Sequence, residues 1–374
     1  MDDKKKEIKY AAPRLLPRNG VKLDANIFMK EKSEAEYTLG LLQGSGGEGH
    51  GKRFFNPQLL ISPLLTKEAV MSSKIEGTIS TVSDVYKYEA GEKTHHSGTA
   101  EVYNYRKAMR QAVELVQSGK KMNKSHIKDI QKTLLTGVRH KGHLGEFRKE
   151  DVWIGEHQND PIEKAIYVPP FYPAVESYMD NLFEYIEHGI DDPLTKVALA
   201  HYQFEAVHPF CDGNGRVGRW LIPLILFENK RISHPILYMS GYFDLHREEY
   251  RQALHGVDTT QEYEKWLKFF FNSVISQAKE TLSIITEINK LYEKIKTEIG
   301  TSKSPYLLPF LAYMFESPVF HSSAVIKKLK TTYPPISNII KILTEKKIIS
   351  LIHNPDKRKK VYAFDPLIEL LTNI

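Results

Sequence analysis

Cysteine is almost absent from this chain, and so are long apolar runs and any strong excess of charge of one sign. The 374 residues contain a single cysteine, which excludes an internal disulfide framework and is typical of a protein kept in a reducing compartment. No apolar run approaches the ~20 residues that a membrane-spanning helix needs, and the polar N-terminus lacks the apolar core of a signal peptide. These absences predict a soluble, cytoplasmic protein with no membrane partner.

Charge and length set only outer limits on the function. The formal net charge is +6, and much of the excess lies in the N-terminal DDKKK and in residues 357–360, so it does not indicate a nucleic-acid-binding protein overall. A hydrophobic content of 41% is enough for packed cores. Because 374 residues exceed the usual size of one domain, we expect two or three units.

The most informative segment is HPFCDGNGRVGR, residues 208–219. His208 can take a proton near neutral pH. The Asp212 carboxylate is a hard oxygen ligand suited to Mg²⁺, which usually binds through one or two carboxylates together with substrate phosphates. The lone cysteine, Cys211, lies between them, and thiol catalysis is the weaker interpretation of it.

The glycines and arginines of the same segment suit an anion. Gly213 and Gly215 allow a tight turn whose backbone N–H groups face an anion, and Asn214 tolerates left-handed geometry beside them. Arg216 and Arg219 are three residues apart on the helix that should follow, so they share a face and can hold phosphate oxygens. The segment therefore predicts a site for a nucleoside triphosphate.

Segment 208–219 resembles the signature of the Fic (filamentation induced by cyclic AMP) family, His-x-Phe-x-Asp/Glu-Gly-Asn-Gly-Arg-x-x-Arg, with every specified position filled. The resemblance implies transfer of AMP from ATP to a Ser, Thr or Tyr hydroxyl of a protein, with release of pyrophosphate. By that resemblance the site consists of the general base His208, the Mg²⁺ ligand Asp212, the anion hole of Gly213, Asn214 and Gly215, and the phosphate ligands Arg216 and Arg219.

Several properties of such an enzyme stay open at this point. The protein target, any self-modification site and a homodimer, a common assembly for this architecture, cannot be identified from the sequence. The preference for ATP over other nucleotides rests on the resemblance alone. The same site could instead remove AMP from a modified protein, with Glu76 positioning water. A third interpretation is a DNA-binding regulator whose core senses a nucleotide.

A second motif, TKEAVMSSKIEGT, lies far upstream. Thr66 can cap a helix that Gly77 ends. Glu76 would lie in its last turn, where the helix dipole disfavours a negative charge and favours a cationic partner. The run that begins at Ser72 resembles the inhibitory motif of the Fic family, Ser/Thr-x-x-x-Glu-Gly/Asn. The resemblance implies that Glu76 pairs with Arg219 and blocks the γ-phosphate of ATP.

A β-hairpin is predicted just before the central helices. Residues 152–154 and 166–168 are predicted as short strands around an Asn-Asp-Pro turn. In the Fic family such a flap docks the target segment by main-chain pairing, a form of strand addition with little side-chain selectivity. The preceding GEFR, residues 145–148, is also typical of the family. The residues assigned to target docking are Val152, Ile154, Ile166 and Val168.

Apolar helical patterns lie on either side of the motif. Asp192 and Pro193 are a favourable helix start, and residues 194–207 carry only two formal charges, which predicts a largely buried central helix. Residues 220–227 predict a second buried helix, bent near Pro223. The two helices would form a rigid mount for the polar loop between them.

Two further helices are predicted after the motif. Residues 244–258 form a charged-faced pattern with Tyr250 on its apolar side. The resemblance assigns Tyr250 to an adenine pocket, although this chain lacks the usual tyrosine pair, and a core tyrosine is an equally good interpretation. Residues 262–300 predict one long helix.

The C-terminal residues form a separate pattern. Helices are predicted over 305–315, 322–329 and 337–347, followed by a hairpin of 350–353 with 361–364. Three helices and a hairpin resemble a winged helix-turn-helix. Its basic side chains could bind DNA phosphates, but such modules often make protein contacts, and both uses stay open. The side chains concerned are Asn338, Lys341, Lys346, Lys347, Lys357, Arg358, Lys359 and Lys360.

The expected fold is therefore mainly α, a Fic-type helical bundle with a β-hairpin flap, plus a C-terminal winged helix-turn-helix module. We expect an N-terminal helical region over residues 1–100, with its inhibitory helix at about 66–77. A catalytic core over 101–285 follows, and then a linker helix with the winged-helix module over 286–374.

Overall fold

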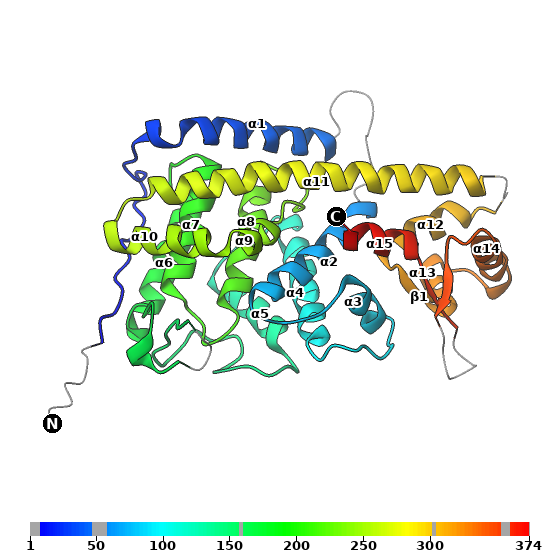
Figure 1. Cartoon of the computed structure of the whole chain (residues 1–374), viewed down its shortest axis with the longest axis horizontal. Coiled ribbons are helices and arrows are strands. Elements are labelled where there is room, and N and C mark those ends of the chain that lie inside the picture. Colours follow the sequence, from blue (N-terminus) through cyan, green and yellow to red (C-terminus); the bar gives the residue numbers. More distant parts are fainter. Residues whose placement is uncertain (1–7, 47–57, 157–159, 301–303, 353–359, 374) are drawn as a thin grey trace. The chain divides into compact units, whose positions relative to one another are not determined.

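The structure is a computed structural model that describes residues 8–46, 58–156, 160–300, 304–352 and 360–373. The chain divides into two compact units. Unit 1 comprises Met1–Leu39, Lys107–Arg231 and Tyr238–Ile275, and unit 2 comprises Gly40–Arg106, Ile232–Leu237 and Ser276–Ile374. Three helices contain residues of both units, namely α1 (Met29–Gly46), α4 (Thr99–Gln117) and α11 (Glu264–Ile299) (Figure 1).

The fold is mainly helical, as predicted. The other α-helices of unit 1 are α5 (Lys124–Leu135), α6 (Val175–His188), α7 (Pro193–Val207), α8 (Asn214–Glu228), α9 (Ser240–Leu245) and α10 (Arg247–Thr260). Its short 3₁₀ turns are η1 (Ala25–Ile27), η2 (Ile162–Lys164) and η3 (Tyr172–Ala174). Across the described residues, none of the helices combines the length and the apolar character that crossing a membrane requires.

Helix α7 is the central helix of unit 1. The Asp192 side chain accepts a hydrogen bond from the backbone N–H of Thr195 at 3.1 Å, and Pro193 occupies the first helical position. Every other residue of the helix except Glu205 is buried. Helix α7 packs against α6 and α8. The predicted start and the predicted burial are both confirmed.

Helix α8 is longer than predicted. It begins at Asn214 rather than at Trp220 and continues through Pro223. A proline inside a helix removes one backbone hydrogen bond. Here Leu221 and Leu224 on either side of it are fully buried, and burying such side chains contributes about 1.5–3 kcal/mol each. Packing therefore offsets the missing bond.

The helix predicted over residues 244–258 is confirmed from Arg247 onward as α10, but its predicted start is wrong, because residues 244 and 245 belong to a separate helix, α9. Two helices, α9 and α10, meet at His246, whose φ of −110° and ψ of 38° are not helical. Tyr250 lies on the buried side of α10, as predicted. The long helix predicted over 262–300 is confirmed as α11.

In unit 2, helix α2 (Gln58–Ile75) extends well beyond the predicted start. Thr66 is not an N-cap, because it is fully buried inside the helix and its hydroxyl donates to the Ser62 carbonyl at 2.8 Å. Leu60 and Leu64 on the earlier turns are buried as well. Their burial extends the helix through Pro63, which the sequence pattern alone did not indicate.

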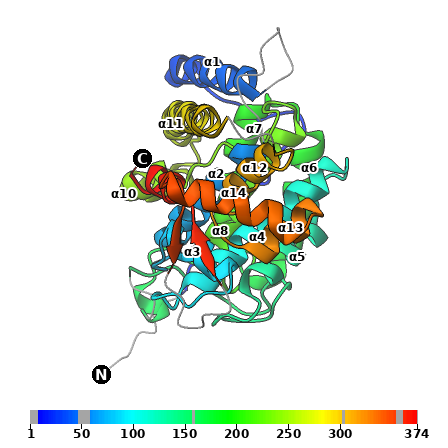
Figure 2. The ribbon, with the colours of Figure 1, turned by 90° about the vertical axis from the view of Figure 1, so that its right-hand side faces the viewer.

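The C-terminal part of unit 2 contains a small antiparallel sheet of order β1-β3-β2. In the register, Phe320 and Leu351 both pair with Tyr362. Along the chain the elements follow in the order α12, β1, α13, α14, β2, β3 and α15, and strand β1 contacts both α13 and α3 (Figures 1 and 2). The bounds of these elements, with α3 from earlier in the unit, are α3 (Val82–Glu89), α12 (Leu307–Glu316), β1 (Val319–His321), α13 (Ser322–Leu329), α14 (Tyr333–Glu345), β2 (Ser350–Ile352), β3 (Val361–Ala363) and α15 (Asp365–Asn373).

Most of the C-terminal elements were predicted. The three helices and the pairing of β2 with β3 are confirmed, although α14 begins at Tyr333 instead of 337, with two prolines in its first turn. Strand β1 and helix α15 were not predicted. Strands β2 and β3 are equally short, but the Asn-Pro-Asp sequence between them indicated a hairpin, whereas no such turn sequence marks β1. The basic residues Lys357, Arg358 and Lys359 lie outside the described residues.

Candidate active site

The short loop between α7 and α8 carries the predicted motif, and both of its ends are left-handed. His208 follows α7 with φ 49° and ψ 63°, and its backbone N–H donates to the Phe204 carbonyl at 3.0 Å. Gly213 precedes α8 with φ 84°. A non-glycine residue in this region costs on the order of 1 kcal/mol. Contacts around His208 must therefore hold its backbone in place.

Asn214 closes the loop with its side chain. Its Oδ1 accepts from the Phe210 N–H at 2.8 Å, and its Nδ2 donates to the Phe210 carbonyl at 2.7 Å. Asn214 is 2% exposed and is the first residue of α8. Asn214 and Gly215 are both helical, so of the three residues predicted to form the glycine turn only Gly213 is left-handed.

The N-terminus of α8 has the geometry of an anion site. Among the described residues no side chain caps it, because its N-cap is Gly213. The first N–H groups of a helix have no acceptor within the helix, and they carry the positive end of its dipole. Phosphate groups bind at such positions. The geometry fits the anion hole predicted for Gly213, Asn214 and Gly215.

Asp212 is fixed from two sides. Its Oδ1 lies 3.2 Å from Nη2 of Arg216, one turn into α8. Its backbone carbonyl accepts from Nε2 of Gln131 at 3.2 Å, and the Oε1 of Gln131 accepts from the Gly145 N–H at 2.7 Å. Gln131 lies on α5 and is 1% exposed. A buried amide therefore ties the motif loop to α5 and to the segment before the flap.

The surroundings of Asp212 fit Mg²⁺ only in combination with phosphate oxygens. The Asp212 side chain is 30% exposed, which leaves the carboxylate accessible. In the part of the chain that the structure describes, no three His, Cys, Asp or Glu side chains cluster as a metal site. Mg²⁺ usually binds one or two carboxylates and substrate phosphates, so one carboxylate beside an anion-binding helix end suits this ion.

Arg216 and Arg219 lie three residues apart on α8, as predicted, and are 4% and 3% exposed. Burying a guanidinium is costly unless it is paired. Each of the two has a polar or electrostatic partner. They are therefore held side chains and not solvated surface charges.

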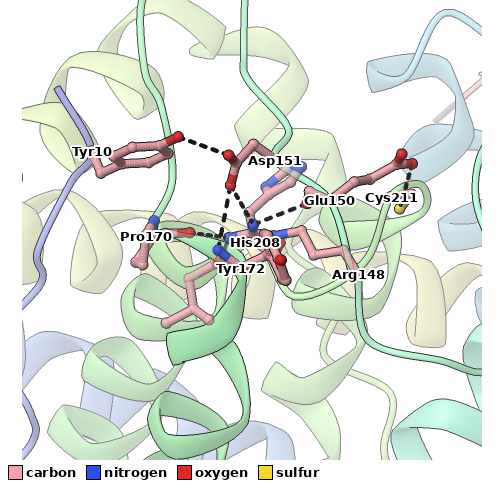
Figure 3. A network of polar contacts seen from close by, with 9 residues as sticks. Tyr10, Arg148, Glu150, Asp151, Pro170, Tyr172, His208 and Cys211 are labelled. Carbon is pink, nitrogen blue, oxygen red and sulfur yellow. Dashed lines mark hydrogen bonds and ion pairs between the residues drawn. The ribbon is translucent and has the colours of Figure 1, made fainter. Parts of the chain in front are cut away.

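Arg148 reaches the motif from outside, and sequence analysis did not assign it to the site. Its Nε donates to the His208 carbonyl at 2.9 Å, and its Nη2 donates to the carbonyls of Val207 at 3.3 Å and Pro170 at 2.5 Å (Figure 3). The backbone N–H of Arg148 also donates to the Pro209 carbonyl at 2.8 Å. Arg148 therefore binds the chain on both sides of His208.

The Cys211 thiol is poorly suited to nucleophilic chemistry. It is half-buried, and its Sγ donates to Oε1 of Glu150 at 3.5 Å (Figure 3). Burial, followed by the hydrogen bond to Glu150, raises the pKa of Cys211 to about 11. Because the thiolate is the nucleophile, a thiol that stays protonated near neutral pH is inert. This supports the interpretation of Cys211 as filling a variable motif position.

The predicted flap is present as one antiparallel bridge between Ile154 and Tyr167. The N–H groups of Ile154 and Ile166 donate to the carbonyls of Tyr167 and Ile154, each at 2.8 Å. Residues 157–159 of the turn lie outside the described residues. The paired region is shorter than the two three-residue strands predicted. Among the predicted docking residues, Val152, Ile154 and Val168 are half-buried and Ile166 is exposed.

Tyr250 belongs to a buried aromatic cluster. Its ring stacks on Phe243 at 4.4 Å between centroids, and its hydroxyl lies 2.9 Å from Nε2 of His201. Nδ1 of His201 lies 3.0 Å from the Gly218 carbonyl, so Nδ1 carries the proton and Nε2 accepts from Tyr250. Burial lowers the pKa of His201 to about 3, which keeps the ring neutral. The assignment of Tyr250 to an adenine pocket stays a prediction.

Comparison with known proteins bears on this site directly. The family model described as Fic/DOC family N-terminal matches residues 29–114, and the model described as Fic/DOC family matches residues 121–226. Together they cover just over half of the chain. The chain is a Fic/DOC family protein. The second match includes the flap, the loop between α7 and α8, and most of α8.

Curated relatives of this Fic protein bear the name of adenylyltransferases. Protein adenylyltransferase fic-1 of Caenorhabditis briggsae is 29% identical over 163 residues, which are 37% of this chain and 32% of that protein. A probable protein adenylyltransferase of Aquifex aeolicus (strain VF5) is 28% identical over 165 residues, which are 42% of this chain and 49% of that protein. The alignments thus span about a third to a half of these relatives.

Solved structures share the fold. The crystal structure of a Fic family protein from Desulfovibrio desulfuricans G20 superposes with a TM-score of 0.59 at 18% identity, over 93% of this chain and 98% of that one. Fic-1 (residues 134–508) from Caenorhabditis elegans gives a TM-score of 0.52 at 16% identity, over 69% and 73%. At these identities the comparison shows a mainly helical Fic fold.

The segment with the predicted inhibitory glutamate lies in unit 2 of this Fic protein. Glu76 is the first residue beyond α2 and not part of its last turn. The Thr78 and Gly77 N–H groups donate to the carbonyls of Ser73 and Lys74 at 3.0 Å, and Gly77 has φ 83°. This is the Schellman pattern, with Glu76 at the C-cap. Ser72, at the start of the motif, is fully buried.

Two residues that hold the site, Arg148 and Gln131, escaped sequence analysis. Arg148 stands in the GEFR stretch that is typical of the family, but no residue pattern indicated which atoms it binds. Nothing in the sequence marked Gln131. Both act on backbone groups of the motif loop and not on its side chains.

Proposed function

We propose that this Fic protein transfers AMP from ATP to a Ser, Thr or Tyr hydroxyl of a protein and releases pyrophosphate. The observation that carries the proposal is the combination, within one loop and one helix N-terminus, of His208, the carboxylate of Asp212 and an uncapped end of α8. These are a base, a metal ligand and an anion site. The adenylyltransferase names of the relatives support the same activity.

In the proposed reaction the His208 imidazole accepts the proton of the target hydroxyl. The hydroxyl oxygen forms a bond to the α-phosphorus of ATP. The bond between that phosphorus and the oxygen that bridges to the β-phosphate breaks, and pyrophosphate leaves with the bonding electrons. AMP stays on the target. His208 is half-buried at the C-cap of α7, where the target proton can still reach it.

The phosphates are bound by the start of α8. Its backbone N–H groups and Arg216 bind phosphate oxygens, and Arg219 binds one turn further along. Asp212 would hold Mg²⁺, and the ion, when bound, neutralises phosphate charge and orients the leaving group. Phosphoryl transfer depends mainly on positioning and charge stabilisation, which rigid donors on a buried helix supply.

The flap is proposed to dock the target protein, and Glu76 at the C-cap of α2 is proposed to restrain the activity. An extended target segment pairs with the main chain of residues 152–154 or 166–168 and so brings its hydroxyl to His208. Glu76 restrains the activity, because a carboxylate that competes with the γ-phosphate for Arg219 leaves the α-phosphate of ATP misplaced. The Schellman turn supports this role by fixing the backbone of Glu76.

The experiment is incorporation of label from α-labelled ATP in the presence of Mg²⁺, with the protein alone and with a cell lysate. Strong labelling is expected for Glu76→Gly and weak labelling for wild type. Glu76→Gln, which keeps the side-chain size and removes its charge, should also be activated if charge is the restraint. Glu76→Gly/His208→Ala should fall by about a hundredfold or more, because the target hydroxyl loses its base.

Silence of every variant, with α-labelled GTP, UTP and CTP as well as with ATP, would contradict AMP transfer. The removal of AMP from a modified protein would then become the better function for the same residues. Labelling of the double variant at the level of Glu76→Gly would contradict the role of His208 as the base.

The C-terminal part of unit 2 is proposed to be a winged-helix module that contacts a protein. The order of its helices and strands, with β3 between β1 and β2, supports the winged-helix assignment. On α14, Lys341 has an acidic neighbour, Glu345, at 3.8 Å, so this helix does not present a purely basic face. We therefore expect no salt-sensitive binding to duplex DNA in a mobility-shift assay. Tight binding that weakens steeply with salt would favour the DNA-binding regulator instead.

A further inference from the structure

Arg148 is a deeply buried cation beside the motif loop, and within the described part of the chain its side-chain hydrogen bonds go to main-chain carbonyls. Its side chain is 0% exposed. The guanidinium donates to the carbonyls of His208, Val207, Pro170 and Glu150. Nη1 also lies 3.9 Å from Oδ1 of Asp151. A guanidinium offers five N–H donors in a rigid plane, so this residue is suited to hold several carbonyls in one fixed arrangement.

One side of this arrangement is the end of α7. The last carbonyls of a helix have no partner within the helix, and they form the negative end of its dipole. Arg148 provides a cation and donors for two consecutive carbonyls there, those of Val207 and His208. Because His208 is a left-handed C-cap, rotation of its peptide groups would swing the imidazole. Fixing the His208 carbonyl therefore fixes the backbone from which the ring projects and so restrains the position of the ring.

The other side of the arrangement is the base of the flap. The Glu150 and Pro170 carbonyls belong to the segments that enter and leave the hairpin closed by the Ile154–Tyr167 bridge. A second link runs parallel to the first, since the Tyr167 hydroxyl donates to the Ala206 carbonyl at 2.8 Å. The flap and the end of α7 are thus joined directly through side chains.

Asp151 anchors the same cluster to the N-terminal segment. Its Oδ2 accepts from the Tyr10 hydroxyl at 2.7 Å, and its Oδ1 accepts from the Tyr172 N–H at 3.3 Å (Figure 3). This carboxylate partly balances the charge of Arg148 and helps to hold it in place. The network therefore extends from His208 to Tyr10 through two charged side chains.

We propose that Arg148 is a positioning residue that sets the direction of His208 relative to the flap, and thereby the distance between the base and the docked target hydroxyl. The proposal rests on the proposed AMP transfer. It does not involve the nucleotide, because the groups that Arg148 binds lie at the end of α7 and at the flap base. Misplacing a catalytic group by about 1 Å can cost about a hundredfold in rate.

The test compares Arg148→Lys and Arg148→Ala with Arg106→Lys, all in the Glu76→Gly background. Arg106 is a matched control, because it is 1% exposed and hydrogen-bonded to Ser62 at 2.7 Å but lies in unit 2. Label incorporation from α-labelled ATP into a cell lysate is measured against ATP concentration. For both Arg148 variants kcat should fall about a hundredfold while the apparent KM for ATP changes less than about threefold. Arg106→Lys should keep kcat.

Two further readouts separate positioning from a loss of folding. Guanidinium at low millimolar concentration should restore part of the activity of Arg148→Ala and none in the His208→Ala variant. In histidine-labelled protein, the ring signal of His208, assigned by its loss in His208→Ala, should shift or broaden in both Arg148 variants and stay in place in Arg106→Lys.

An unchanged His208 signal in Arg148→Ala would overturn the proposal. So would a kcat close to that of the Glu76→Gly background, or a fall that Arg106→Lys reproduces. The ring signal does not depend on activity. If the Glu76→Gly protein transfers no AMP and the signal still moves, the positioning role stands and the proposed function fails.

Discussion

Replacing Asn214 with alanine tests whether the motif loop is held by its own backbone or by this one side chain. Asn214→Ala removes both hydrogen bonds to Phe210, and Phe210 is fully buried. The N–H and the carbonyl of Phe210 would be left inside the protein without these partners. Each buried group that loses its partner costs about 1–3 kcal/mol, so for the two groups we expect a loss of about 2–6 kcal/mol in the free energy of unfolding.

Tryptophan fluorescence is a suitable assay, because it reports on one unit. The chain has three tryptophans, and all of them lie in unit 1. Two of these, Trp220 and Trp266, are nearly fully buried, so unfolding of unit 1 exposes them. At a urea dependence of about 2 kcal/mol per M, the expected loss lowers the unfolding midpoint by roughly 1–3 M.

The control is Asn229→Ala at the other end of α8. Asn229 is half-buried, and within the described part of the chain its side chain makes one hydrogen bond, from Nδ2 to the Ile225 carbonyl at 2.8 Å. Its loss should cost about 1 kcal/mol. If the midpoint for Asn214→Ala falls no further than that for Asn229→Ala, the loop does not depend on the Asn214 side chain, and the reasoning is refuted.

Two other predictions use the same fluorescence assay. A methyl group at Gly218 would overlap the side chain of Glu205 and lie 3.0 Å from the ring of Phe204. Gly218→Ala should therefore destabilise unit 1 by about 1–3 kcal/mol. The control is Gly256→Ala, which should be neutral or stabilising because the added methyl group meets nothing within 4 Å. A midpoint for Gly218→Ala at or above that for Gly256→Ala would contradict a tight contact at Gly218 and would show that the Glu205 side chain and the Phe204 ring move aside. Burial raises the pKa of Asp258 from 3.8 to about 6, so its ionisation opposes folding by up to about 3 kcal/mol above pH 6 and by nothing below about pH 4. Asp258→Asn should therefore raise the midpoint at pH 7.5 and leave it unchanged at pH 4, and an equal gain at both values would contradict the assigned pKa.

Sequence patterns predicted the helices around the site well where burial and capping agreed. The start of α7 carried both signals, an Asp192 cap and Pro193 at the first helical position, and it was placed correctly. The start of α2 was placed too late, because apolar packing carries this helix through Pro63. The start of α8 was also placed too late, because its first turns, Asn214 to Arg219, are polar and rich in glycine and lack the apolar pattern that begins at Trp220. A proline indicates the loss of one helical hydrogen bond, and only the burial of neighbouring side chains decides whether the helix continues through it.

The sequence predicted the reactive side chains of the site but not the residues that hold them in place. His208, Asp212 and the start of α8 are chemically distinctive, and the structure brings them together. What holds them was not predictable, because Arg148, Gln131 and Asn214 all bind main-chain atoms of the loop. A main-chain carbonyl is the same at every position, so no residue pattern marks the partner of one.

Because the residues that support the motif loop lie outside the motif, the effect of a substitution on the site depends on whether it removes such support. The loop between α7 and α8 is held partly from α5, through Gln131, and partly from the segment before the flap, through Arg148. A reactive group keeps its geometry only as well as the residues that support it. Substitutions of Gln131 and Arg148 should therefore disturb the site more than substitutions of exposed residues in the motif itself. This holds although Gln131 lies more than sixty residues before the motif. The size of the disturbance should depend on which hydrogen bonds to the loop are lost and not on how far the substituted residue lies from the motif in the sequence.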